Sequence, residues 1–303
     1  MKKNFILRCT LFICSLTFAQ KSIDLFTISG HYGLPSNFEE TYSGKATETG
    51  MMANLVVPIV FNKKQIWYNS VNYMQWNVSN NVQMPSDIAN PIHIHGIILR
   101  TGLIQKLSNK NSLQILFAPR LMTDFHNVDS NHLQLGGTFI YEKIYHEHLK
   151  IGYGVLYNQE TFGPNVVPLV NLDWQITERW SMTGLLPIYS KIKYKVNEKL
   201  NLGMHHFGLV TSYRLGEEAY KNDYIERRSI DLGLFARYKL IGNVHAESRF
   251  GYSFGRSYAQ YDEGQKIDLA LPLATIGDDR IQKNTNFSDG AYLHFRLVYA
   301  LPL

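Results

Sequence analysis

SIDLGLFARYKLIGNVHAESRFGYSF, residues 229–254, contains two runs in which apolar and polar side chains alternate around a glycine-containing turn. Alternation with a period of two is the signal of a β-strand, because successive side chains of a strand point to opposite faces. The stretch therefore predicts a β-hairpin. Its apolar positions are Ile230, Leu232, Leu234, Ala236, Tyr238 and Leu240 in the first run, and Val244, Ala246, Phe250, Tyr252 and Phe254 in the second.

The apolar faces also predict the register of this hairpin. Leu240 should lie opposite Val244, which leaves residues 241–243 as a three-residue loop. The same register pairs Tyr238 with Ala246, and Arg237 with Glu247 as an opposite-charge pair on the polar face.

Both runs are longer than the roughly five or six residues of a typical globular strand. They suit the roughly nine to eleven tilted residues that a strand needs to cross a bilayer. We therefore expect an all-β fold, an antiparallel transmembrane β-barrel whose apolar face meets lipid and whose polar face lines a lumen.

The first residues resemble a secretory signal. Lys2 and Lys3 precede an apolar run over residues 5–18, and Thr17-Phe18-Ala19 offers a cleavage site after Ala19. We expect residues 1–19 to be a signal peptide and residues 20–303 to form the barrel. The only two cysteines, Cys9 and Cys14, lie in the signal, which excludes disulfides and cysteine-ligated zinc from the mature chain.

The global charge gives no support for nucleic-acid binding. Three of the 30 basic residues lie in the signal, which leaves 27 against 25 acidic residues, a formal charge of +2. No mature segment has the eighteen or so consecutive apolar residues that a transmembrane helix needs.

The rest of the chain repeats the pattern of the hairpin. About fourteen strands are expected, with twelve or sixteen as the limits, and short connections alternate with long ones. Short turns on one side and long loops on the other are the rule for barrels of the Gram-negative outer membrane. The expected strands cover residues 23–32, 53–61, 67–78, 92–107, 113–121, 133–141, 149–157, 166–176, 180–188, 192–196, 200–215, 229–240, 244–254 and 291–303.

The last expected strand indicates two partners. Its apolar residues alternate back from Leu303, in a pattern similar to the closing strand that bacterial barrel-assembly machinery recognises, although Leu303 replaces the usual phenylalanine. Outer-membrane lipid is the other expected partner.

The polar faces carry more basic than acidic side chains. By parity eleven bases and four acids face the lumen, and such a lumen would concentrate small anionic solutes. The alternative is that the charges pair with one another in a narrow or plugged lumen. The candidate lumen-lining residues are Arg100, Arg120, Asp173, Arg214, Asp231, Arg237, Glu247, Arg249 and Arg296.

Catalytic and metal chemistry have weaker signals. His93 and His95 share a strand face, but a metal would need a third ligand from elsewhere. His205, His206 and Ser212 lie on one expected strand without a nucleophile motif around them. We expect no cofactor and no enzyme activity, with an outer-membrane lipid hydrolase as the remote alternative.

The chain resembles a known family in three places. The context Phe18-Ala19-Gln20, the weak first strand before a polar loop, and the strand over residues 180–187 leading into residues 192–202 are similar to uncharacterised outer-membrane β-barrel proteins of the Bacteroidota, grouped as a domain of unknown function. The resemblance implies a barrel in the outer membrane and carries no site residues. We expect a passive channel or small-solute transporter, with a non-conducting structural or adhesive barrel as the alternative.

Overall fold

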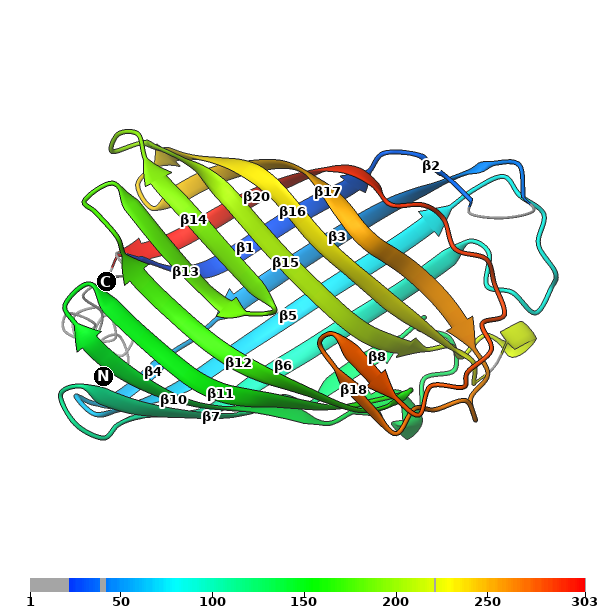
Figure 1. The fold of residues 1–303 in the computed structure, drawn as a ribbon, viewed down its shortest axis with the longest axis horizontal. Coiled ribbons are helices and arrows are strands. Elements are labelled where there is room, and N and C mark those ends of the chain that lie inside the picture. The colour runs from blue at the N-terminus through cyan, green and yellow to red at the C-terminus, as the bar shows by residue number, and fades with distance from the viewer. Residues whose placement is uncertain (1–21, 39–41, 221, 303) are drawn as a thin grey trace, which may run out of the picture.

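The chain forms a closed antiparallel barrel of 14 strands in a computed structural model that describes residues 22–38, 42–220 and 222–302 (Figure 1). The predicted signal peptide and Leu303 lie outside the described residues. The first and last strands, β1 and β20, pair from Ser22↔Pro302 to Gly33↔Tyr292 and so close the barrel. The wall strands are β1 (Ser22–Gly33), β3 (Lys45–Val56), β5 (Gln65–Ser79), β6 (Ile92–Lys106), β7 (Asn111–Phe117), β10 (Gly136–His146), β11 (Leu149–Glu160), β12 (Gly163–Gln175), β13 (Trp180–Leu186), β14 (Tyr189–Lys195), β15 (Leu200–Arg214), β16 (Tyr224–Ile241), β17 (Val244–Tyr261) and β20 (Gly290–Pro302).

Shorter segments extend or cover these strands. Two of them, β4 and β8, follow prolines that interrupt the preceding strand, since proline cannot donate to the sheet. The short elements are β2 (Ser36–Asn37), β4 (Ile59–Asn62), β8 (Arg120–Thr123), β9 (Leu133–Gln134), β18 (Leu269–Leu271), β19 (Ala274–Ile276), η1 (Ser130–His132) and η2 (Glu218–Tyr220). No helix among the described residues is long and apolar enough to cross a membrane.

The β16–β17 hairpin has the predicted register. Tyr238 pairs with Ala246, and Arg237 pairs with Glu247. The predicted three-residue loop is wrong, because the register shifts between Lys239 and Ile241 and lets Ile241 pair with Val244. The turn is therefore the two residues 242 and 243, with Gly242 at φ +53°, a conformation that glycine adopts without steric cost.

The apolar face of the wall points outward. Leu234, Phe250 and Phe295 are 61%, 56% and 59% exposed at the middle of their strands. Polar partners on the same strands, such as Glu247 and Asp231, are buried inside. This is the arrangement of a membrane barrel, in which the hydrocarbon contacts the outer face.

The two rims of the barrel differ. Six short turns and the paired ends of β1 and β20 lie at one rim, and the long connections over residues 80–91, 124–135 and 262–289 lie at the other, on the right of Figure 1. The β13–β14 hairpin is an exception, because its turn lies part-way along the barrel.

A buried apolar core, which the sequence did not predict, lies inside the barrel near the long loops. Most of its residues come from β5, β6, β15, β16 and β17, in the strand segments nearest the long loops. The others come from β3, from β8 and from the loops themselves. The largest members are Trp76, Ile94, Met122, Tyr213, Ile225, Tyr258 and Phe287. The lumen is therefore obstructed toward the long loops.

Candidate solute-binding cavity

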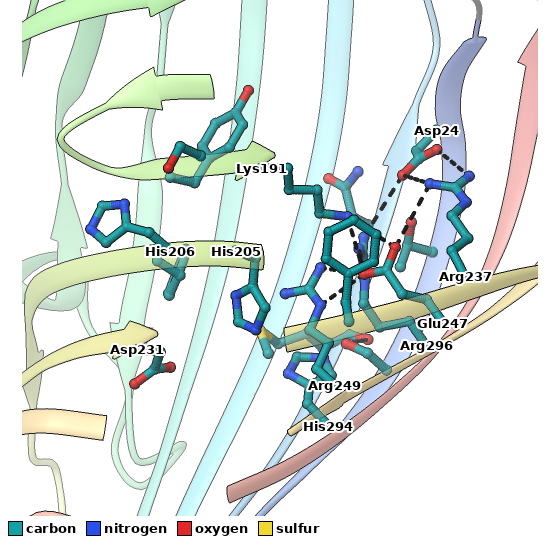
Figure 2. A pocket seen from close by; sticks show the side chains of 18 of the residues that line it. Asp24, Lys191, His205, His206, Asp231, Arg237, Glu247, Arg249, His294 and Arg296 are labelled. Atoms are coloured by element: carbon teal, nitrogen blue, oxygen red, sulfur yellow. Dashed lines mark hydrogen bonds and ion pairs between the residues drawn. The ribbon is translucent and has the colours of Figure 1, made fainter. Parts of the chain in front are cut away.

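A cavity of about 490 Å³ occupies the remaining part of the lumen (Figure 2). It extends from Asp24 near the short-turn rim to Trp76, where the apolar core begins. Five basic and three acidic side chains line it. These are Lys191, Lys193, Arg237, Arg249 and Arg296, with Asp24, Asp231 and Glu247.

Glu247 is the centre of the charged cluster. Only 1% of the residue is exposed, and its carboxylate accepts hydrogen bonds from Lys191 Nζ at 2.9 Å, Arg249 Nε at 2.7 Å and Arg296 Nη1 at 2.8 Å. Arg237 Nη1 lies farther away, at 3.8 Å from Glu247 Oε2. A carboxylate with this many cationic donors stays ionised although it is buried.

The register of the strands brings this cluster together. Glu247 on β17 lies opposite Arg237 on β16 and opposite Arg296 on β20. Arg249 follows two positions along β17 and so shares the inward face. Lys191 reaches the same carboxylate from β14, across the lumen (Figure 2).

Asp24 neutralises a second part of the cluster. Its carboxylate accepts hydrogen bonds from Arg237 at 2.8 Å and 3.2 Å, and Arg296 Nη2 lies 3.9 Å away. Guanidinium groups stay protonated in proteins. The three arginines alone therefore outnumber the two carboxylates that they contact, and the cluster has an excess of positive charge.

Histidines and aromatic rings cover the wall toward the apolar core. His31 stacks on Tyr292 with 5.0 Å between ring centroids, and the hydroxyl of Tyr292 lies 3.1 Å from Nε2 of His205. Nδ1 of His205 and Nε2 of His294 are buried without a hydrogen-bond partner among the described residues. Polar groups of this kind can accept or donate to a solute or to water.

A second buried carboxylate, Glu48, lies beside the apolar core and contacts one of its members. Glu48 accepts hydrogen bonds from Arg227 at 3.0 Å, Arg256 at 3.2 Å and the hydroxyl of Tyr258 at 2.6 Å. The guanidinium carbon of Arg227 lies 3.6 Å from the ring centroid of Trp76, a close cation–π contact. These side chains form a seal across the lumen.

The structure brings five of the nine predicted lumen residues into this cavity: Asp231, Arg237, Glu247, Arg249 and Arg296. Arg120 pairs with Glu160, and Arg214 pairs with Glu263, both away from the cavity. Asp173 is buried in β12, and Arg100 is half-buried in β6.

Sequence reasoning did not single out Asp24, His205, His294 or Tyr292 as members of the site. Alternation indicates only which residues face inward. Nothing in the local sequence indicates which inward residues from distant strands meet, such as Lys191 and Glu247.

Residues with possible catalytic or metal chemistry are not assembled into a site in the described part of the chain. Ser212 donates its hydroxyl hydrogen bond to Glu160, whereas His205 contacts Tyr292. Along the described ranges no group of three or more histidine, cysteine, aspartate and glutamate residues is placed to hold a metal ion.

The chain belongs to the family described as "Domain of unknown function (DUF6268)", whose profile matches residues 16–267. No curated protein shows significant sequence similarity to it.

Several solved barrels are similar in fold. The COG4313 outer membrane channel from Pseudomonas putida F1 is 10% identical, with a TM-score of 0.47 over 92% of this chain and 96% of that one. The NanC porin is 12% identical, with a TM-score of 0.38 over 91% and 100%. A FadL homologue from Pseudomonas aeruginosa is 10% identical, with a TM-score of 0.34 over 90% and 74%. Nothing about the solute of this chain follows from these similarities.

Proposed function

We propose that the protein is a barrel of the Gram-negative outer membrane that acts as a passive channel or transporter for small anionic solutes. A closed wall with an apolar outer face supports insertion in lipid, and long loops at one rim support an outer-membrane orientation. In that orientation the short turns face the periplasm. Assembly then depends on the barrel-assembly machinery.

The observation that carries the proposal is the group of cations around Glu247. Lys191, Arg249 and Arg296 converge on a single carboxylate and line the cavity. In an enclosed lumen, such an excess of positive charge attracts anions and repels cations.

Ion selectivity in a planar bilayer tests this proposal. In a potassium chloride gradient, the reversal potential of the purified barrel should have the sign that indicates a preference for chloride over potassium. Arg249→Gln should shift this potential toward zero, because it removes one lumen cation. Lys199→Gln, which removes a charge from an exposed turn, is the matched control and should leave it unchanged. A cation-selective wild-type barrel would contradict the proposal.

A non-conducting structural or adhesive barrel is the second candidate. The apolar core and the seal at Glu48 support it, since both obstruct the lumen toward the long loops. Complete absence of conductance from folded protein in the same bilayer experiment would favour this candidate.

A further inference from the structure

The barrel wall has a notch at the β13–β14 hairpin. These two strands have only seven residues each, whereas β15 has 15. The hairpin pairs with β12 only over Val170–Gln175, and with β15 only over residues 201–207. Beyond its turn, β12 and β15 continue without a wall strand between them in the described chain (Figure 1).

The part of the notch nearest the long loops is filled. There, β18 pairs with β12 at Asn165↔Ala270, and the amide of Ile267 donates to the carbonyl of Phe162 at 2.8 Å. Phe162, Ile267 and Ala270 belong to a small buried apolar cluster, and Val210 of β15 packs against it. The unfilled part therefore lies between this cluster and the β13–β14 turn.

The lumen cavity reaches this unfilled part. Its lining includes Ser190 and His206, which pair with each other across β14 and β15. Both side chains belong to the outward face, because the adjacent Lys191 and His205 face the lumen. Met204, on the same outward row as His206, is 58% exposed. A cavity lined from both faces of the sheet must pass beside the hairpin turn.

The surroundings of His206 agree with such a passage. Figure 2 shows its ring on β15, apart from the charged cluster at Glu247. A Cβ atom added at Gly208 would lie 3.4 Å from both His206 Nε2 and the carbonyl oxygen of Pro187 at the turn. His206 and the carbonyl of Pro187 thus place polar groups beside the turn, next to Ile188 in the chain.

We propose that this notch is a lateral exit from the cavity to the bilayer, and that it admits anionic amphiphiles with a single apolar chain. The inference rests on the proposed function and names its substrate class. The carboxylate binds among Lys191, Arg249 and Arg296, and the apolar chain extends past Ile188 toward lipid. Lys191 is three residues from Ile188, about 10 Å along the strand, a distance that a medium-length alkyl chain spans.

Nitroxide labels on single cysteines test whether the passage exists. Residues 20–303 have no cysteine, so Met204→Cys, His205→Cys and His206→Cys each provide one site in phosphatidylcholine vesicles. The label at position 204 should collide with oxygen dissolved in lipid, and the label at 205 with a water-soluble nickel chelate. The label at 206 should collide with both. A label at 206 that behaves like the one at 204 would overturn the lateral exit.

Binding of dodecanoate tests the occupant. In lipid nanodiscs Gly208→Phe, which narrows the notch, should weaken dodecanoate binding by about tenfold, equivalent to about 1.4 kcal/mol, and leave chloride conductance unchanged. Arg249→Gln should reduce both. Unchanged dodecanoate affinity in Gly208→Phe would overturn the inference while the channel proposal stands. Loss of anion selectivity in the wild-type barrel would instead overturn the proposed function.

Discussion

Single carboxylates organise the interior of this barrel. Glu247 and Glu48 each hold two or more cations that would otherwise repel one another. Removing one partner of a buried ion pair is costly, because the remaining charges are left in a medium that solvates them poorly. The two carboxylates therefore differ in position but share a role, one in the cavity and one in the seal.

Glu247→Gln should destabilise the folded barrel by about 3–5 kcal/mol, the usual cost of breaking a buried ion pair. Denaturant unfolding in detergent, followed by tryptophan fluorescence, measures the change in free energy of unfolding. Glu198→Gln, in an exposed turn, is the control and should change the stability little. Equal effects of the two substitutions would show that the cluster is not a stabilising centre.

Glu48→Gln should raise the single-channel conductance. The neutral amide no longer holds Arg227 and Arg256 in place, so the seal above Trp76 loosens. Asp173→Asn is the matched control, because it neutralises another buried carboxylate that neither lines the cavity nor contacts Arg256. A conductance that stays at the wild-type value in Glu48→Gln would locate the obstruction in the apolar core alone.

At the scale of elements, Arg280 is one of several side chains that attach the long segment between β17 and β20 to the wall, together with Lys283 and Asn284. Arg280 donates to Glu226 at 2.7 Å and to both oxygens of Asp278 at 2.9 Å, and its guanidinium carbon lies 4.3 Å from the ring centroid of Tyr261. The segment includes β18 and β19, which fill the outer part of the notch. The segment therefore covers the part of the notch nearest the long loops.

Acid should loosen the segment locally around Arg280. The hydrogen bonds from Arg280 lower the pKa of Asp278 below its usual value of 3.8. A lowered pKa contributes stability that is complete above the unfolded value and is lost as the pH falls through the folded value. Amide hydrogen exchange of residues 277–285 should therefore accelerate, relative to residues 229–254, below about pH 4. Asp278→Asn should abolish this pH dependence, and an unaltered acid response in that variant would contradict the assignment.

At the scale of the whole molecule, the sequence predicts the barrel well because alternation is a local property. The 14 strands, the closed sheet and the pairing of Arg237 with Glu247 all follow from it. The strand predicted over residues 53–61 is wrong at both ends. β3 begins earlier, at Lys45, because the polar residues that follow Lys45 pair with β5 although they show no apolar alternation. At the other end, Pro58 interrupts the strand before β4.

The interior could not be predicted in the same way. Parity places Lys191, Glu247 and Trp76 on inward faces, but their contacts depend on the curvature of the sheet and on strands far apart in sequence. The apolar core was missed because its members lie near the long loops, in segments where apolar residues face inward rather than toward lipid.

The lipid-facing surface gives a prediction for the complete barrel. Leu234→Arg places a charge on the outward face in the middle of β16 and should cost about 2–4 kcal/mol near the bilayer midplane. Folding into phosphatidylcholine vesicles, measured by denaturant titration, gives the difference. Leu234→Ala is the control for lost side-chain volume. If Leu234→Arg lowered the free energy of unfolding less than Leu234→Ala does, this face would not lie against hydrocarbon.

The seam between β1 and β20 joins the earliest strand to the latest one. β20 is the last wall strand along the chain, so the edge of β1 has no partner in the sheet until β20 joins it. An intermediate of this kind exposes a long unpaired edge that can recruit other chains. The closed sheet thus depends on the last wall strand: a truncated copy that lacks β20 would keep the edge of β1 open.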